Sequence, residues 1–195
     1  NSFDSNLQFT THANCYENSK YKQVIFNTSD SSLRNHHYAN LLEKNSNADL
    51  KGVFFASNNQ IIDNKTQINH LAELCQSNQK YKGILTDSAK ASYLSKTHVD
   101  KIAQKTEAYQ LSKGIILSDN AYFHSKPELK IFADDVKCSH GSTIGSFDKS
   151  ILFYIKSRGI PENIAISLLI KSFYHDILVD QNDTTFLGIV YQSIQ

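Results

Sequence analysis

The sequence contains no methionine, not even at its first position, although it runs to 195 residues. We therefore expect it to be an internal or C-terminal piece of a longer protein. Its three cysteines, Cys15, Cys75 and Cys138, are widely spaced and odd in number. This pattern does not form a disulfide framework and favours a reducing compartment such as the bacterial cytoplasm, with a plastid left open. Neither a CxxC nor an HExxH motif occurs, so a closed zinc site made by this chain alone is not expected.

The chain also has no marked charge excess and no long apolar run. Its formal net charge is +1 and its basic residues are scattered, so we expect binding neither to nucleic acid nor to a membrane surface. No apolar stretch approaches the ~20 residues of a membrane-spanning helix. Hydrophobic residues make up 40% and aromatic residues 11% of the chain, which is enough for the core of one domain, with or without a small appendage.

An evenly spaced repeat runs through the middle of the chain. The tetrapeptide KGVF at residues 51–54 recurs as KGIL at 82–85 and as KGII at 113–116, in steps of 31. A second phrase, KTQI at residues 65–68, recurs as KTHV at 96–99 with the same step. A period of this length is typical of a solenoid, in which each unit buries its apolar face against its neighbours.

The repeating units consist of short strand-like runs separated by turn residues. Examples of the runs are residues 83–85 and 92–94, and the expected turns include Asp63-Asn64 and Asp87-Ser88. No amphipathic helix of two or more turns fits between the runs, which disfavours a helical repeat or a βαβ unit. We therefore predict a mainly β fold wound as a parallel β-solenoid, with asparagine and threonine side chains bonded to backbone groups at its corners.

Residues 1–47 give weaker signals. Residues 21–26 are a plausible strand, whereas residues 33–42 fit a helix or a strand equally. His36 and His37 are expected to be exposed or loosely packed. We place the β-helix core at residues 1–145, with 1–47 poorly assigned, and a C-terminal helical segment at 146–195.

Helical periodicity begins after Gly145. One helix is predicted over residues 148–157, with Ser146 as its candidate N-cap. A second helix opens at Pro161, since proline suits the first helical position, and a weaker third helix is possible over 185–194. The second helix is apolar around much of its circumference, so it requires cover on more than one side, either from the core or from another protein.

Residues 132–145 hold the densest group of reactive side chains in the chain. In an extended strand Cys138 and His140 face the same side, together with Asp134 and Val136. Thiolate and imidazole are good iron ligands, but two ligands are too few to hold an iron–sulfur cluster. The pair is therefore part of a site shared across an interface, a transient site, or no site at all. Cys138 alone is equally explained as a small buried apolar residue.

Residues 127–145 resemble the signature of the SufB/SufD family of iron–sulfur cluster assembly proteins, and residues 152–160 continue the resemblance. Upstream, residues 81–85 and 115–118 also look like the β-helix segments of the family. The order Lys-Cys-Ser-His-Gly at 137–141 is similar to the SufD branch. The SufB branch usually carries a His-Glu pair in place of His140 and Gly141. The chain thus resembles the C-terminal portion of a SufD-branch protein.

The resemblance implies a right-handed parallel β-helix followed by a small α-helical segment. It implies a scaffold rather than an enzyme, with no tightly bound cofactor and with a transient iron–sulfur cluster at the partner interface. The implied partners are a SufB-like subunit in a heterodimer and a SufC-like ATPase, with a homodimer left open. His140 and Cys138 would then be transient iron ligands shared with the partner chain. The residues expected to contact the ATPase are Phe153, Arg158, Leu168 and Phe173.

Two other classes of function compete with a scaffold. A β-helix enzyme acting on polysaccharide requires carboxylates or a bound calcium aligned along one face, and the acidic residues between 48 and 126 form no such ladder in the register of the repeat. A purely structural or adhesive solenoid leaves the Cys138–His140 segment and the helices unexplained. Since no GxxxxGKS or GxxxxGKT loop is present, ATP hydrolysis would have to come from a partner.

Overall fold

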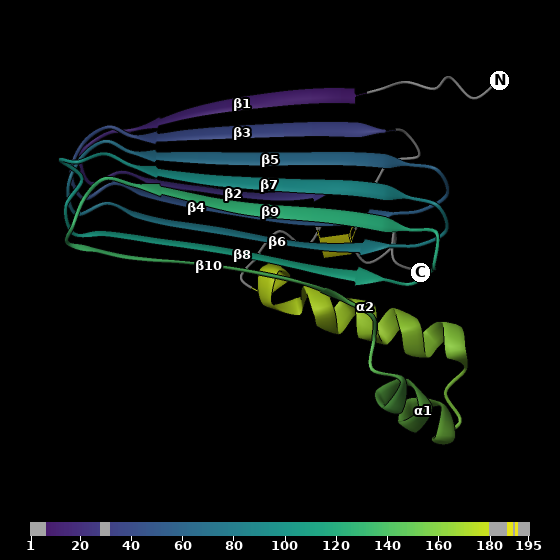
Figure 1. Ribbon diagram of the computed structural model, residues 1–195. Coiled ribbons are helices and arrows are strands. Elements are labelled where there is room, and N and C mark those ends of the chain that lie inside the picture. The colour runs from purple at the N-terminus through teal and green to yellow at the C-terminus, as the bar shows by residue number, and fades with distance from the viewer. Residues whose placement is uncertain (1–6, 28–31, 180–186, 189, 191–195) are drawn as a thin grey trace.

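The computed structural model describes residues 7–27, 32–179, 187, 188 and 190. These residues form ten strands and two long helices (Figure 1). The strands extend well beyond the short runs expected from the sequence. In chain order the elements are β1 (Leu7–Cys15), β2 (Lys20–Asn27), β3 (Leu33–Leu41), β4 (Asn47–Ala56), β5 (Ile61–His70), β6 (Gln76–Leu85), β7 (Lys90–Val99), β8 (Thr106–Ile116), β9 (Tyr122–Ile131), β10 (Val136–Gly145), α1 (Lys149–Ser157) and α2 (Glu162–Leu178).

Odd and even strands build two separate parallel sheets. Sheet A has the order β1-β3-β5-β7-β9, and sheet B has the order β10-β8-β6-β4-β2. Each coil of the chain adds one strand to each sheet, and the two sheets face one another across a shared interior (Figure 1). The mainly β, parallel β-helix fold predicted from the sequence is confirmed.

Alternation along each strand fills the interior. In β5 and β7 every second residue is buried, because successive side chains of a strand point to opposite faces of its sheet. Tyr81 of sheet B and Tyr93 of sheet A stack inside with ring centroids 4.3 Å apart. Cys15 and Cys75 are buried in a neighbouring apolar cluster.

The corners of the coils repeat a left-handed backbone conformation. Asn18 and Asn45 both have φ of 58°, and Leu74 and Lys105 take the same conformation in the following coils. Asparagine tolerates this region better than most residues. The amide of Asn45 donates to Oδ1 of Asn18 at 2.7 Å, so here corner asparagines bond to one another along the stack rather than to the backbone.

The period read from the sequence holds for only part of the solenoid. Gly83 pairs with Gly114 as predicted, but Gly52 pairs with Tyr81 instead of with Gly83. Likewise Lys65 pairs with Leu94 and not with the lysine two positions later. The corner before β8 covers positions 100–105 and is longer by one position than the corner 71–75 before β6, and β8 is itself longer by one. A slip by two positions keeps each side chain on its own face, which is why the false register gave a consistent pattern.

Three local predictions in the first half were resolved or overturned. Residues 33–41 form a strand, β3, and His37 points into the interior with 5% of its surface exposed, so it is not loosely packed. The predicted turn at Asp63-Asn64 is wrong, since both residues lie within β5. Asn64 is buried there and accepts a hydrogen bond from the amide of Asn27 at 2.9 Å, which explains a polar residue in a strand interior.

The change from strand to helix falls between Gly145 and Lys149. The N-cap of α1 is Asp148, whose carboxylate accepts from the backbone N–H of Ser150 at 2.8 Å. The prediction that Ser146 caps this helix was wrong, because Ser146 lies two residues before the cap, in the link between β10 and α1. The possible third helix over 185–194 lies largely outside the described residues.

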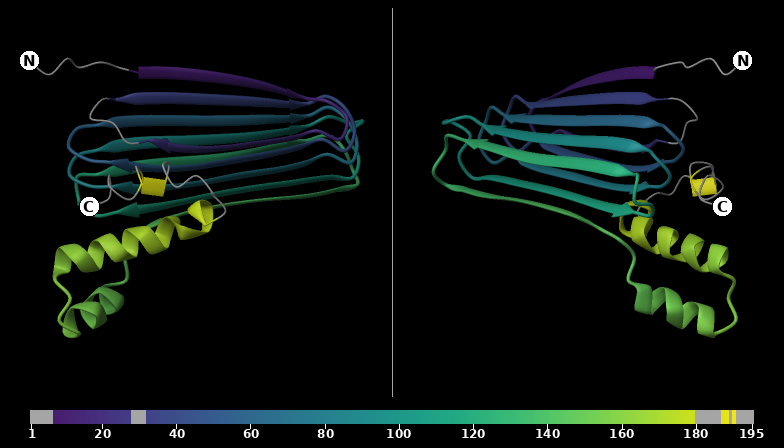
Figure 2. Two further views of the ribbon diagram at one scale, coloured as in Figure 1. Left: turned by 180° about the vertical axis from the view of Figure 1, so that it is seen from behind. Right: turned by 45° about the vertical axis from the view of Figure 1, so that its right-hand side comes forward.

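Helix α2 covers part of the outer face of sheet B, while α1 stands farther from the sheets (Figure 2). The buried residues Ile170, Tyr174 and Ile177 of α2 pack against Val53 and Ile84. The Tyr174 hydroxyl donates to the carbonyl of Phe54 at 2.6 Å. Among the described residues, no helix combines the length and the apolar character needed to cross a membrane.

Candidate functional site

Strand β10 carries the Cys138–His140 segment at one edge of sheet B. It pairs with β8 on one side, where Cys138 lies beside Ala108 and His140 beside Gln110. Ala108 and Gln110 are both buried and face the interior. Neighbouring residues in a parallel register share a face, so Cys138 and His140 both lie on the interior face of the last coil.

The interior of this last coil is only partly closed. Cys138 is half-buried against the small apolar cluster of Val99, Ala103 and Ala133. Burial raises the pKa of its thiol, and a hydrogen bond with the backbone of Ala108 offsets this in part. His140, two positions further along, is exposed. The strand therefore presents a shielded thiol beside an accessible imidazole.

The acidic residues before β10 take no part in this face. Asp134 and Asp135 lie in the bend between β9 and β10, so the expectation that Asp134 shares the face of Cys138 was wrong. The carbonyl of Asp135 accepts from the backbone N–H of Lys105 at 2.6 Å, and its own N–H donates to the side chain of Gln104. These contacts give Asp135 a structural role at the turn.

A row of hydrogen-bonded polar side chains crosses the interior and ends next to His140. Thr66 donates to Oε1 of Gln79 at 2.5 Å, and Nε2 of Gln79 donates to Oγ1 of Thr97 at 2.8 Å. Nε2 of Gln110 donates to the same Thr97 oxygen at 2.8 Å. Sequence reasoning missed Gln79 and Gln110, although they pair in the same register as Gly83 and Gly114 and so recur with the same step.

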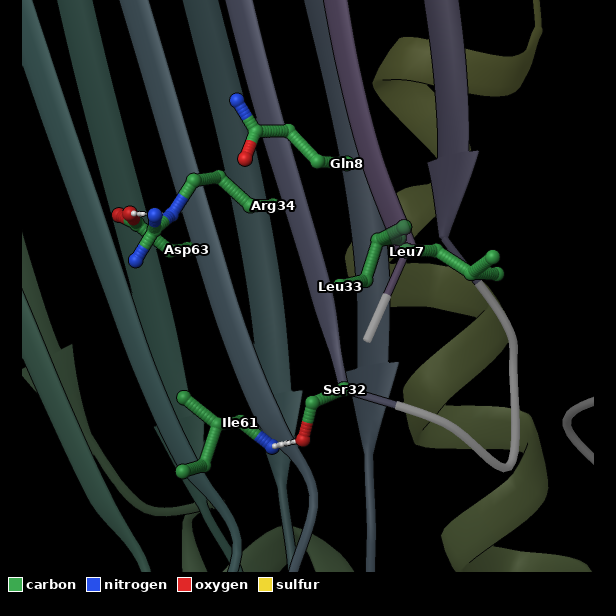
Figure 3. Close-up of a pocket in the computed structure, with 7 residues that line it drawn as sticks. All are labelled: Leu7, Gln8, Ser32, Leu33, Arg34, Ile61 and Asp63. Carbon is green, nitrogen blue, oxygen red and sulfur yellow. Dashed lines mark hydrogen bonds and ion pairs between the residues drawn. The ribbon is translucent and has the colours of Figure 1, made fainter. Parts of the chain in front are cut away.

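The described residues place no further metal ligand beside Cys138 and His140. Within the part of the chain that the structure describes, no group of three or more His, Cys, Asp or Glu side chains is placed to hold a metal ion. A hollow of about 280 Å³ lies elsewhere, on the strands β1, β3 and β5 of sheet A, where Arg34 pairs with Asp63 at 3.1 Å (Figure 3). None of its lining residues belongs to β10.

The residues expected to contact an ATPase divide into two groups. Phe153 on α1 and Leu168 on α2 are exposed, with 74% and 46% of their surfaces accessible. Arg158 stacks its guanidinium over the ring of Tyr154 at 5.1 Å from the centroid, and it is exposed as well. Phe173 differs from these, because it is partly buried against the cluster that joins α2 to sheet B.

A buried lysine fixes α2 on the sheet, and sequence reasoning did not find it. Nζ of Lys82 on β6 donates to the carbonyl of Phe173 and to the carboxylate of Asp176, both at 2.5 Å. Burial lowers the pKa of Lys82, and the bond to Asp176 opposes that effect. Burial also acts against the charge on Asp176, but hydrogen bonds from Lys80 and Lys82 outweigh it and hold the pKa of this carboxyl below its usual value.

The comparison with known families agrees with this geometry. Residues 4–173 match the model of the SUF system FeS cluster assembly, SufBD core domain. The chain belongs to this family. Over 141 residues it is 33% identical to the iron–sulfur cluster assembly protein SufD of Escherichia coli (strain K12), an alignment that covers 72% of this chain and 33% of SufD.

Relatives from two other lineages extend the match. The SufD protein of Plasmodium falciparum (isolate 3D7) is 29% identical over 153 residues, which cover 78% of this chain and 10% of that protein. The chloroplastic protein ABCI7 of Arabidopsis thaliana is 42% identical over 64 residues, which cover 33% of this chain and 14% of ABCI7. This SufBD member therefore resembles the SufD branch, and it spans about a third of the length of the Escherichia coli relative.

Proposed function

We propose that this chain is a SufD-like scaffold in SUF-type iron–sulfur cluster assembly, working with a SufB-like subunit and a SufC-like ATPase. The observation that carries the proposal is the placement of Cys138 and His140 together on the interior face of β10, the edge strand of sheet B. In a chain of the SufBD family, a half-buried thiol and an exposed imidazole on an edge strand support a site that a second chain would complete.

The end of the solenoid formed by β9 and β10 is the surface we assign to the SufB-like subunit. Edge strands present unpaired backbone donors and acceptors that readily pair with another chain. Apolar side chains are exposed at this end as well, with Ile131 37% and Ile144 43% accessible. Covering this end with a second scaffold would bury these side chains and close the space around His140. When the SufB-like subunit is absent, a second copy of this chain would bind to the same end.

Two ligands define half of a cluster site. A cluster is usually held by four thiolates or their equivalents, so the partner would have to supply the remaining ligands. Burial favours the protonated form of Cys138, and a thiol loses its proton when a metal binds it. The site would therefore hold a nascent cluster briefly, as cargo, and keep no resident cofactor.

The SufC-like ATPase is assigned to α1 and to the exposed side of α2. Phe153, Tyr154 and Leu168 place apolar surface in water on two adjacent helices, and Arg158 lies at the end of the first. Large exposed apolar side chains grouped in this way mark protein–protein contact sites. ATP hydrolysis would belong to that partner, and this chain would act without catalysis of its own, in the cytoplasm or in a plastid.

The experiment is anaerobic purification of the chain co-expressed with a SufB-like subunit and a SufC-like ATPase. His140→Ala is expected to reduce iron and sulfide several-fold while the three proteins still elute together on size exclusion. His124→Ala is the matched control, since His124 is exposed on the neighbouring strand β9 but faces away from the interior. Unchanged iron and sulfide in His140→Ala, or a loss in His124→Ala of the same size, would contradict the proposal.

A further inference from the structure

Gln110 holds a buried acceptor that lacks a donor. Its side chain lies on β8 with 3% of its surface exposed. In the described part of the chain no hydrogen-bond donor reaches its Oε1 atom, which is fully buried. A buried acceptor left without a partner costs about 1–3 kcal/mol, so such an atom in a polar row points to a donor that a neighbouring side chain supplies when it turns toward the row.

The orientation of this amide is fixed by its nitrogen. Nε2 donates to Oγ1 of Thr97 at 2.8 Å and to the backbone carbonyl of Glu128 at 3.3 Å. A backbone carbonyl accepts and never donates, so turning the amide over would set two oxygens against each other. Oε1 is therefore held on the side away from Thr97 and Glu128.

The equivalent glutamine one coil earlier shows what the row requires. Gln79 pairs in register with Gln110, and its Nε2 also donates to Thr97. Oε1 of Gln79 is satisfied by the hydroxyl of Thr66 at 2.5 Å. Each glutamine of the row thus has the same donor contact, and only the later one has an empty acceptor.

The residue beside Gln110 on the following strand is His140. The two are register partners on β8 and β10, and both lie on the interior face. Adjacent strands are about 4.8 Å apart, and the exposed side chain of His140 is free to turn about its torsions. An imidazole N–H is a donor of the kind that Oε1 lacks.

We infer that Gln110 is a positioning residue for His140: its Oε1 accepts one ring N–H and so leaves the other ring nitrogen free to bind iron. This rests on the proposed function for the identity of the metal cargo, but the hydrogen bond itself does not. An imidazole that donates one ring N–H to a fixed acceptor has a defined tautomer and orientation. Removing the acceptor that orients a metal-binding histidine typically costs about 10–100-fold in metal affinity or activity.

The hydrogen bond is tested on the isolated chain by ¹⁵N NMR of the histidine rings, with the His140 signals assigned by their loss in His140→Ala. The expected result is one tautomer with a ring N–H protected from exchange with water. Gln110→Met keeps the shape but removes the acceptor, so the protected N–H should vanish.

Gln79→Met is the matched control, because it breaks the same interior row one coil away from His140. It should lower stability about as much as Gln110→Met and leave the His140 signal unchanged. An unprotected His140 ring in the unaltered chain, or equal loss of the signal in both methionine variants, would overturn the inference.

The metal role is tested separately in the co-expressed complex. Gln110→Met should retain about tenfold less iron at limiting supply than the unaltered complex, and Gln79→Met should retain the normal amount. If His140→Ala leaves iron unchanged, the proposed function fails while the hydrogen bond is still decided by NMR. If His140→Ala loses iron and Gln110→Met does not, the positioning role is wrong and the proposed function stands.

Discussion

The ammonium of Lys82, on the outer face of sheet B, lies 2.5 Å from the carboxylate of Asp176 on α2. The lysine side chain is 6% exposed, whereas that of Asp176 is 48% exposed. The pair joins the helical segment to the solenoid, because Lys82 also bonds the carbonyl of Phe173. The surface that we assign to the ATPase partner therefore depends on an ion pair to which the solenoid contributes the lysine.

Asp176→Asn should loosen α2, because it leaves the charge of Lys82 buried beside a neutral side chain. The half-exposed position of Asp176 reduces the effect, so we expect a loss of about 1–2 kcal/mol, compared with about 3–5 kcal/mol for a fully buried pair. Hydrogen exchange of the α2 amides measures it. The double variant Lys82→Met with Asp176→Leu should recover much of the protection, since it removes both charges. A double variant no better than Asp176→Asn would show that the charge pair is not what holds the helix.

Substitutions on the outer surface of the helices should affect partner binding without affecting the attachment of α2 to the sheet. Phe153→Asp and Leu168→Asp alter exposed side chains and are expected to abolish capture of a SufC-like ATPase without lowering the melting temperature. Phe173→Asp should lower the melting temperature as well, because its ring packs on sheet B and lies under Lys82. Pull-down and thermal unfolding on the same preparations check both effects. Capture that survives Phe153→Asp and Leu168→Asp would remove α1 and α2 from the partner surface.

Replacing Gly83 by alanine should destabilise the solenoid. A Cβ at this position would meet Cζ of Phe54 on the preceding coil at 2.0 Å, so the ring or the strand must move. Overpacking of this kind typically costs about 1–3 kcal/mol, and we expect about 2 kcal/mol or more from urea unfolding of Gly83→Ala. Gly145→Ala, at a glycine with open space around it, should change stability by less than about 0.5 kcal/mol. Adding Phe54→Leu to Gly83→Ala should recover part of the lost free energy of unfolding. If it recovers none, the contact with the Phe54 ring is not the cause of the loss.

Stability should fall as the pH drops from 7 toward 4. Burial lowers the pKa of His70 to about 4, and that of His37 shifts to a similar value for the same reason. When the pH falls below the ordinary histidine pKa, these histidines bind protons in the unfolded chain but stay neutral in the folded chain. The free energy of unfolding therefore decreases until the pH reaches the pKa of the folded state. Each group contributes on the order of 3 kcal/mol at most.

Urea unfolding at pH 7.5, 6 and 5 measures this slope. His70→Gln removes one titrating group, so the change in the free energy of unfolding with pH should decrease by the equivalent of about one proton. The variant also lowers stability at pH 7.5 through the lost bond to Ser77. His124→Gln, at an exposed histidine, should leave the slope as it is. Equal slopes in all three proteins would mean that His70 is charged in the folded state.

Much of the fold follows from local chemistry that the sequence displays. Short strand-like runs, recurrent turn residues and the absence of amphipathic helices between them predicted a solenoid, because these patterns act within one strand or one turn. The positions of α1 and α2 followed from their periodicity for the same reason. The pairing of Cys138 with His140 on one face needed only the alternation of side chains along a strand.

The contacts between coils were decided by the tertiary structure. Whether Gly52 lies beside Gly83 or Tyr81 depends on the length of each corner, and a slip by two positions leaves the pattern of faces intact. The same holds for the neighbours that matter at the site. Gln110 lies beside His140, and Lys82 beneath Asp176, because separate coils and a returning helix bring them together. The sequence by itself determined the alternation that puts Cys138 and His140 on one face, and only the packed coils decided which side chains meet.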